Sequence, residues 1–400
     1  MGLGLVAPFF QKPGSELILL NRAQSGKNET GDTELAPERK AQLLKEQPQR
    51  LYGIQTPGEP ARLREVVGYT EFRTYNPSDM GEIISDITSR SSAKAEGVVV
   101  TASVVNVSNY SPVVKALNQI CDAKERGEQI GDIYLVACEN TVSAHEVFQR
   151  EEFRDVLLPC TGQATRPVHG LVDRMCVGLE EYPGDGKAIL DPTVLVRAEE
   201  YGSLKLEITP ETEALVELCQ GSKIEFSRHL DVEKKIKGWL LNGTHWLIAL
   251  TAFEASKGNT ELKLNEYLAA HPQRQEFAAQ VIHEISEGIE IMLRNQPEYA
   301  AFVRDISPRD YLDGASAAIL RRFSSTEDSI SRILARFRKP CPDETTTIEN
   351  FVRRFFDRVD PAIAAYAAEK GVEPPATSHG LVSLCRLLAS GTFVNGPVAA

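Results

Sequence analysis

One apolar stretch of the sequence, KGWLLNGTHWLIALTAF at 237–253, contains three side chains that can exchange or polarise a proton: Lys237, Asn242 and His245. On an α-helix they fall at 0°, about 140° and about 80° around the axis, so one arc can present all three. Desolvation makes a neutral lysine amine available as a general base. The amide and the imidazole can donate hydrogen bonds to an oxygen that gains negative charge.

Each of these residues alone also has a structural interpretation. A lysine can extend its ammonium from an apolar helix to solvent, and an isolated histidine is more often a satisfied core residue than a catalyst. Placing an ammonium and an imidazole among tryptophans and leucines is costly unless they are paired or neutral. The combination of the three therefore favours a catalytic site.

A glycine pattern at 2–7 indicates a nucleotide cofactor. Gly2, Gly4 and Ala7 match G-x-G-x-x-[G/A], in which the glycines permit a tight turn and close approach of the backbone to a pyrophosphate. The apolar run Glu16 to Leu20 follows after a helix-length gap. A strand should precede the pattern, yet only Met1 does, so we expect the first strand of the sheet to be missing from this sequence.

The residue that follows this apolar run bears on the choice between NAD and NADP. An acid there holds the ribose of NAD, whereas a nearby arginine can accept the 2′-phosphate of NADP. The sequence has Asn21 followed by Arg22, with Lys27 nearby. We therefore expect NAD or NADP to bind, with a slight preference for NADP or dual use. The alternative is that Arg22 and Lys27 simply face solvent.

Strands and helices alternate in the first half of the chain. Strands are expected at Glu16 to Leu20, Leu51 to Ile54, Glu71 to Thr74, Gly97 to Ala102, Asp132 to Ala137 and Thr193 to Val196. A helix is expected at 113–126. This alternation predicts a Rossmann-type α/β domain with a parallel sheet at residues 1–200. The polar stretch 23–49 is interpreted as a solvated insertion with a short helix near 39–45.

From about Lys237 onward the apolar residues repeat with the period of a helix. Residues 201–400 are therefore expected to form a mainly α-helical substrate and catalytic domain.

Composition excludes several classes of protein. The 400 residues are 42% hydrophobic and 25% charged, as in globular proteins, and the net charge of −12 argues against nucleic acid or an anionic membrane as a partner. Seven cysteines form no CxxC pair, so we expect reduced thiols, no structural metal and a cytoplasmic location. No apolar run reaches the length of a membrane span.

Two predicted strand ends carry further candidate cofactor contacts. Thr101 and Ala102 end one apolar strand, and Glu139 and Asn140 follow the next. Open α/β sheets bind ligands at the carboxyl ends of their strands, so we expect these residues near the cofactor. Simple strand-end turns are the alternative.

The K-x4-N-x2-H pattern of Lys237, Asn242 and His245 resembles the signature of the polyol-specific long-chain dehydrogenase/reductase family, which includes mannitol dehydrogenases. Three further segments resemble that family in the same order: VACEN at 136–140, LVDRM at 171–175 and ILRRFSSTEDSISRI at 319–333. The resemblance runs from residue 2 to about 340.

The resemblance implies a zinc-independent NAD(P) enzyme in which Lys237 is the general base and Asn242 and His245 orient and polarise the reacting oxygen. His169 stands where the family has an asparagine that stabilises the oxyanion, and an imidazole can keep that donor role. Arg332, Lys339 and Arg174 are candidate substrate contacts, with surface helix charges as the alternative for Arg332 and Lys339.

The sequence thus predicts an NAD(P)-dependent oxidoreductase that interconverts a sugar alcohol, or its phosphate, and the corresponding ketose. Its partner would be a small-molecule polyol or sugar phosphate, and its state a monomer or homodimer. Two alternatives remain: a cofactor-binding protein with little catalysis, and a dehydrogenase for a hydroxy acid or opine.

Overall fold

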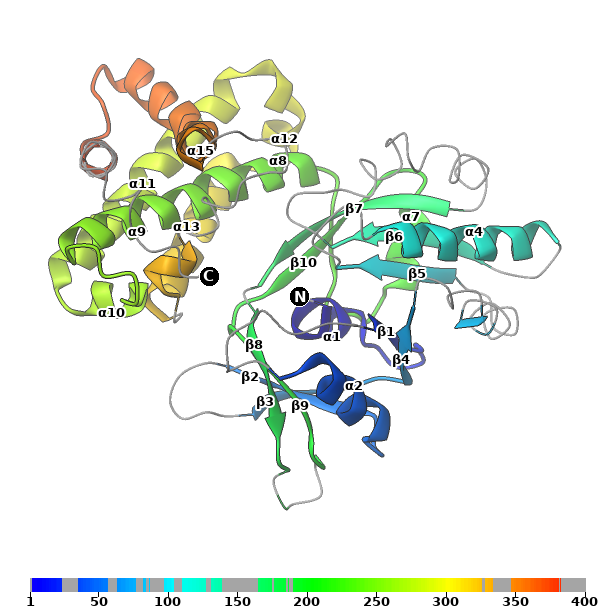
Figure 1. The fold of residues 1–400 in the computed structure, drawn as a ribbon. Coiled ribbons are helices and arrows are strands. Elements are labelled where there is room, and N and C mark those ends of the chain that lie inside the picture. The colour runs from blue at the N-terminus through cyan, green and yellow to red at the C-terminus, as the bar shows by residue number, and fades with distance from the viewer. Residues whose placement is uncertain are drawn as a thin grey trace. The chain divides into compact units, whose positions relative to one another are not determined.

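The chain divides into two compact units, Met1–Leu230 and Asp231–Ala400, here called the first and second unit (Figure 1). The computed structural model describes residues 2–23, 35–56, 63–76, 82–83, 86, 97–103, 110–126, 131–138, 165–174, 176–184, 186, 190–325, 328–333, 347–380 and 382. The division falls after Leu230 rather than near the expected 200, because strands beyond residue 200 still pair with a sheet of the first unit.

The largest sheet of the first unit has the strand order β11-β10-β7-β6-β5. Its strands are β5 (Gly97–Ala102), β6 (Asp132–Ala137), β7 (Thr165–Asp173), β10 (Ser203–Glu207) and β11 (Glu225–Ser227). Strands β5, β6 and β7 are parallel, and β10 runs antiparallel to β7. Helix α4 (Ser111–Glu125) lies between β5 and β6 in the chain. The predicted parallel α/β arrangement is therefore confirmed for this sheet.

The remaining strands of the first unit form two smaller sheets. A mixed sheet has the order β3-β2-β9-β8, from β2 (Leu51–Gln55), β3 (Leu63–Gly68), β8 (Cys176–Tyr182) and β9 (Thr193–Ala198). Strands β1 (Ile18–Arg22) and β4 (Glu71–Tyr75) pair in parallel on their own. The six predicted strands are therefore distributed over three sheets. Among the described residues, no strand joins β1 to β5.

The glycines at the start of the chain lie inside a helix. A π-helix, η1 (Gly2–Val6), runs into α1 (Ala7–Phe10). A Cβ atom added to Gly4 would lie 2.4 Å from Sγ of Cys176 and 3.0 Å from Cγ1 of Val196. The side chain of Arg174 donates from Nη1 to the carbonyl of Gly4 at 2.8 Å. Gly4 therefore allows this helix to pack against β8 and β9.

The polar stretch 23–49 is more than a solvated insertion. Its helix α2 (Pro37–Glu46) buries Leu43 and Leu44 in one core with Phe72 of β4. The hydroxyl of Tyr69 donates to the carbonyl of Leu44, and burial raises the pKa of Tyr69 to about 12. The polar composition of the stretch does not indicate this packing, because two adjacent leucines are enough to attach a charged helix to a sheet.

The second unit is helical in its described part, as predicted. Its elements are α8 (Leu230–Ile236), the π-helix η3 (Lys237–Gly243), α9 (Thr244–Ala255), α10 (Leu264–Ala269), α11 (Pro272–Asn295), η4 (Pro297–Tyr299), α12 (Ala300–Asp305), α13 (Pro308–Ser325) and α15 (Thr347–Lys370). Short helix α7 (Glu213–Leu218) belongs to the first unit. No helix in the described part of the chain is long and apolar enough to cross a membrane.

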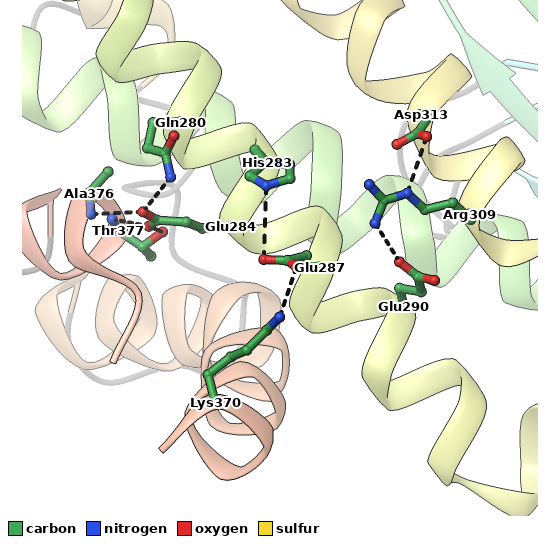
Figure 2. A network of polar contacts seen from close by, with 10 residues as sticks. All are labelled: Gln280, His283, Glu284, Glu287, Glu290, Arg309, Asp313, Lys370, Ala376 and Thr377. Atoms are coloured by element: carbon green, nitrogen blue, oxygen red, sulfur yellow. Dashed lines mark hydrogen bonds and ion pairs between the residues drawn. The ribbon is translucent and has the colours of Figure 1, made fainter. Parts of the chain in front are cut away.

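Helix α11 anchors the helical segment 375–380 through a buried acid (Figure 2). Glu284 is 1% exposed and accepts hydrogen bonds from the backbone N–H groups of Ala376 and Thr377, at 3.1 and 2.8 Å. The hydroxyl of Thr377 and Nε2 of Gln280 also donate to it. A carboxylate in this place satisfies the first N–H groups of the helical segment 375–380.

Two further acids of α11 reach neighbouring helices in the same view (Figure 2). Glu287 pairs with Lys370 of α15 at 3.1 Å, and Glu290 pairs with Arg309 of α13 at 3.1 Å. Helix α11 is therefore tied by charge to α15 and α13, two of the helices that pack against it.

Helices α11 and α15 approach so closely at Gly288 that no side chain fits. A Cβ atom added there would lie 2.0 Å from the carbonyl oxygen of Ala362, a backbone atom that cannot rotate away. We expect Gly288→Ala to lower the free energy of unfolding of the second unit by about 3 kcal/mol through overpacking. Urea denaturation followed by tryptophan fluorescence measures this, because both tryptophans, Trp239 and Trp246, belong to that unit.

Gly314→Ala in α13 is the matched control. Nothing lies within 4 Å of a Cβ atom built there, so alanine should raise stability by about 0.5–1 kcal/mol through its higher helix propensity. Equal effects of the two substitutions would contradict the close approach of α11 and α15.

Candidate active site

Lys237 and Asn242 lie at the two ends of a π-helical turn, η3, and His245 follows at the start of α9. In the α-helix expected from the sequence, residues five apart are about 140° from each other. A π-helix has i→i+5 hydrogen bonds and a wider turn, so residues five apart come closer to one face. The departure from α-helix thus improves the alignment of Lys237 with Asn242. Such π-turns are frequent at functional sites.

Exposure separates these residues from the apolar residues around them. From Leu240 to Leu250 every residue is buried except Asn242 and His245, and Lys237 is also partly exposed. The flanking Leu241 and Trp246 are 6% and 1% exposed. An otherwise buried run therefore presents only its amide and its imidazole to solvent, which a purely structural helix would not require.

Thr244 holds the junction between η3 and α9. Its backbone N–H donates to the carbonyls of Leu240 and Leu241, and its buried hydroxyl donates to the same two oxygens. The carbonyls at the end of the wide turn are thereby satisfied, which fixes the step from Asn242 to His245.

A buried carboxylate lies beside His245. Oδ2 of Asp328 is 3.7 Å from Nε2 of His245, and Oδ1 is 3.4 Å from Nε of Arg332. The Asp328 side chain is 3% exposed, against 15% for His245 and 31% for Arg332. On its other side the imidazole stacks on Phe323, with ring centroids 4.6 Å apart and planes 17° apart. The carboxylate near Nε2 and the stacked ring of Phe323 together confine the imidazole.

The backbone around Asp328 is tied to a neighbouring loop. Its carbonyl accepts from the N–H of Leu264 at 2.9 Å, and the N–H of Ile330 donates to Leu262 at 3.0 Å. An isolated antiparallel bridge pairs Lys263 with Ser329. These contacts fix the position of the acid. Arg332 shares this acid with His245, while Lys339 lies outside the described residues.

In the first unit, two predicted site residues, Ala102 and His169, fall in one row across parallel strands. The register pairs Ala102 of β5 with Ala137 of β6, and Ala137 with His169 of β7. Ala102 and Ala137 are the last residues of their strands, so the row lies at the carboxyl edge where α/β sheets bind ligands. Thr101 precedes Ala102 and is exposed. Glu139 and Asn140 lie outside the described residues.

His169 has an acidic neighbour that the sequence analysis missed. The antiparallel register of β7 and β10 pairs Gly170 with Leu206, and one step further Glu207 faces His169. Their ligand atoms lie within 4.8 Å of each other, and His169 is 6% exposed. Only the pairing of β10 with β7 brings this acid to His169, and β10 was not predicted as part of the parallel sheet.

The arginines that could bind substrate have other partners. Arg174 is 8% exposed and donates from Nε to the carbonyl of Glu199 at 3.0 Å, besides its bond to Gly4. Burial lowers the pKa of Arg174. Arg332, the other candidate arginine, lies beside Asp328. The structure gives Arg174 a structural role in holding η1 against the strands.

The remaining predicted cofactor contacts are at the end of β1. Asn21 and Arg22 are its last two residues, and Nζ of Lys40 donates to Oδ1 of Asn21 at 3.0 Å. Lys27 lies outside the described residues. Gly2 and Ala7 are both within the helix that begins the chain.

Comparison with known proteins gives a likeness in structure only. No family model and no curated protein sequence matches the chain. Among solved structures, a D-sorbitol dehydrogenase in substrate-free form superposes with a TM-score of 0.56 at 13% identity, covering 92% of this chain and 74% of that one. The chain has the fold of that D-sorbitol dehydrogenase. The two-part α/β and helical architecture predicted from the sequence is thereby confirmed.

Weaker likenesses include two other enzymes. The Pseudomonas fluorescens mannitol 2-dehydrogenase matches with a TM-score of 0.43 at 14% identity, covering 80% of this chain and 67% of that one. A ketopantoate reductase from Staphylococcus aureus matches with a TM-score of 0.29 at 10% identity, covering 83% of this chain and 85% of that one.

The buried carboxylate of Asp328 generates a prediction about stability. Asp328→Asn keeps the size of the side chain and removes the charge that faces His245 and Arg332. Because Arg332 can still be hydrated, we expect the free energy of unfolding to fall by about 1–3 kcal/mol. Asp313→Asn is the control, since Asp313 is 61% exposed and its pair with Arg309 should contribute less than about 1 kcal/mol. Equal, small losses would show that Asp328 carries no important charge interaction.

Proposed function

We propose that the chain is an NAD(P)-dependent oxidoreductase that interconverts a sugar alcohol, or its phosphate, and the corresponding ketose. The observation that carries this proposal is the exposure pattern of η3 and α9. Lys237, Asn242 and His245 are the polar exceptions in an apolar segment, and a buried acid and an aromatic ring orient the imidazole. The D-sorbitol dehydrogenase fold supports the same reaction class.

The first unit has features suited to a dinucleotide. The small side chains of Ala102 and Ala137 at the carboxyl edge of β5 and β6 allow a ligand to approach the backbone. Asn21 and Arg22 end β1, where the protein would contact the ribose of such a cofactor. Gly2 and Gly4 carry no side chain that would keep a ligand from the backbone of η1, although Gly4 is already required by packing. A bound nicotinamide would accept hydride in polyol oxidation and donate it in ketose reduction.

Lys237 performs the proton transfer in this proposal. In oxidation its neutral amine accepts the hydroxyl proton of the substrate while the hydride leaves the same carbon, so that a carbonyl forms. In reduction the ammonium returns the proton to the oxygen that receives the new electron pair. The wide π-turn, which brings positions 237 and 242 closer to one face, and the partial exposure of both residues support this role.

Hydrogen-bond donors stabilise the charge that develops on the substrate oxygen. Asn242 offers its amide N–H groups, and His245 offers an imidazole oriented by Asp328 and Phe323. His169 takes the place of an asparagine as a further donor in this proposal, and Glu207 lies beside its ring. Arg332 and Lys339 remain proposed contacts for the polar groups of the substrate.

The proposal is tested by Lys237→Ala, assayed with the polyol and ketose pair that gives the highest turnover in a panel of free and phosphorylated substrates. Loss of a general base should lower kcat by about 100-fold or more while the reduced cofactor still binds. Reduced-nicotinamide absorbance measures turnover, and quenching of protein fluorescence measures binding.

Lys235→Ala is the matched control, because Lys235 is 50% exposed, two residues away, and pairs with Glu298 on the surface. It should retain wild-type turnover. Full activity of Lys237→Ala would exclude the proposed mechanism, and turnover on hydroxy acids but on no polyol would move the substrate to the alternative class.

A further inference from the structure

The carboxyl end of the β1–β4 sheet carries two amide or hydroxyl side chains at one level. The parallel register pairs Asn21 of β1 with Thr74 of β4, and each is the last residue but one of its strand. Side chains paired in register project to the same face of a sheet. Asn21 and Thr74 therefore stand side by side at the edge where α/β sheets bind ligands.

Two lysines of helix α2 reach these two side chains. Nζ of Lys40 donates to Oδ1 of Asn21 at 3.0 Å, and Nζ of Lys45 donates to Oγ1 of Thr74 at 3.0 Å. The helix is held on this face by Leu43 and Leu44, which pack with Phe72 of β4. Both ammonium groups are thus placed at the strand ends by the packing of the helix.

A third basic residue, Arg22, lies at the same edge, whereas a fourth, Arg39, pairs with a carboxylate. Arg22 is the last residue of β1 and is exposed. Arg39, next to Lys40 in α2, is instead held by both carboxylate oxygens of Glu181. The cations at the strand ends are therefore Lys40 and Lys45 on the face of Asn21 and Thr74, and Arg22, which as the next residue of β1 projects from the opposite face at the same edge.

We propose that Lys40, Arg22 and Lys45 bind the 2′-phosphate of an adenosine ribose, so that the protein prefers NADP(H) to NAD(H). This inference rests on the proposed function and specifies its cofactor. Position 21 is decisive, because an acid there would accept hydrogen bonds from the 2′-hydroxyl of NAD and repel a phosphate. An amide that accepts a hydrogen bond from Lys40 instead positions an ammonium where the phosphate would lie.

The chemistry of the ligand fits this cluster. A phosphate monoester carries nearly two negative charges and accepts several hydrogen bonds, and charge-assisted bonds to ammonium and guanidinium groups are the strong ones. A 2′-hydroxyl offers no charge, so the cluster contributes nothing comparable to NAD(H). Arg22 can be recognised in the sequence as a candidate. Lys40 and Lys45 cannot, because only the packing of α2 brings them to β1 and β4.

Fluorescence titration of the full chain with NADPH and with NADH tests the inference without any turnover. The wild-type protein should bind NADPH at least about tenfold more tightly than NADH. Lys40→Ala and Arg22→Ala should each reduce that ratio by about tenfold, with the affinity for NADH unchanged. Lys115→Ala, an exposed lysine of α4, is the control and should leave the ratio as it is.

A reciprocal variant and a competition experiment complete the test. Asn21→Asp should favour NADH, because the new acid pairs with Lys40 and repels the phosphate. Adenosine 2′-monophosphate should displace NADPH at concentrations at which inorganic phosphate does not. Equal competition by the two would overturn the assignment to the adenosine ribose and leave a simple anion site.

The outcomes separate the two proposals. Equal binding of NADPH and NADH by the wild-type protein, or an unchanged ratio in both alanine variants, would overturn the 2′-phosphate site while leaving an NAD(P) enzyme intact. If the protein binds neither cofactor, both the proposed function and the 2′-phosphate site are overturned.

Discussion

The carboxylate of Asp328 is buried in the helical unit and must be balanced by charge there, because an unpaired buried anion is costly. His245 and Arg332 approach it from two elements, and backbone hydrogen bonds to the loop at 260–264 fix its own position. The imidazole is further confined by Phe323. The position of this one acid therefore determines how the imidazole of His245 is oriented on α9.

The fold was predictable where short-range patterns decide it. The strands β5 and β6, helix α4 and the helical second half follow from periodicity alone. The mixed sheet was not predictable. Strands β2 and β9 pair over a long distance in the sequence, and a run of β-branched residues does not reveal which strand it will pair with. The packing of α2 on the sheet was not predicted either, because the two leucines that attach it lie among charged residues.

The site was predictable in its residue types and less so in its geometry. Lys237, Asn242 and His245 stood out because polar residues interrupt an apolar run, and the structure leaves the same residues accessible. The π-turn that aligns them has no signal in the sequence. Glu207 and Lys40 were missed because each reaches its partner across a strand pairing or a helix packing that joins distant segments. For Arg174 the structure adds a packing role that the sequence does not indicate, since Nε and Nη1 donate to backbone carbonyls, and its contact with substrate stays a prediction.

Transfer of a labelled hydride tests the central claim most directly. The reduced cofactor, deuterated at the nicotinamide carbon that gives up hydride, is incubated with the protein and a ketose, and the polyol product is analysed by mass spectrometry. The account predicts a single deuterium on the new carbinol carbon, formed by the wild-type protein and lost in Lys237→Ala. An unlabelled product, or equal labelling by that variant, would contradict it.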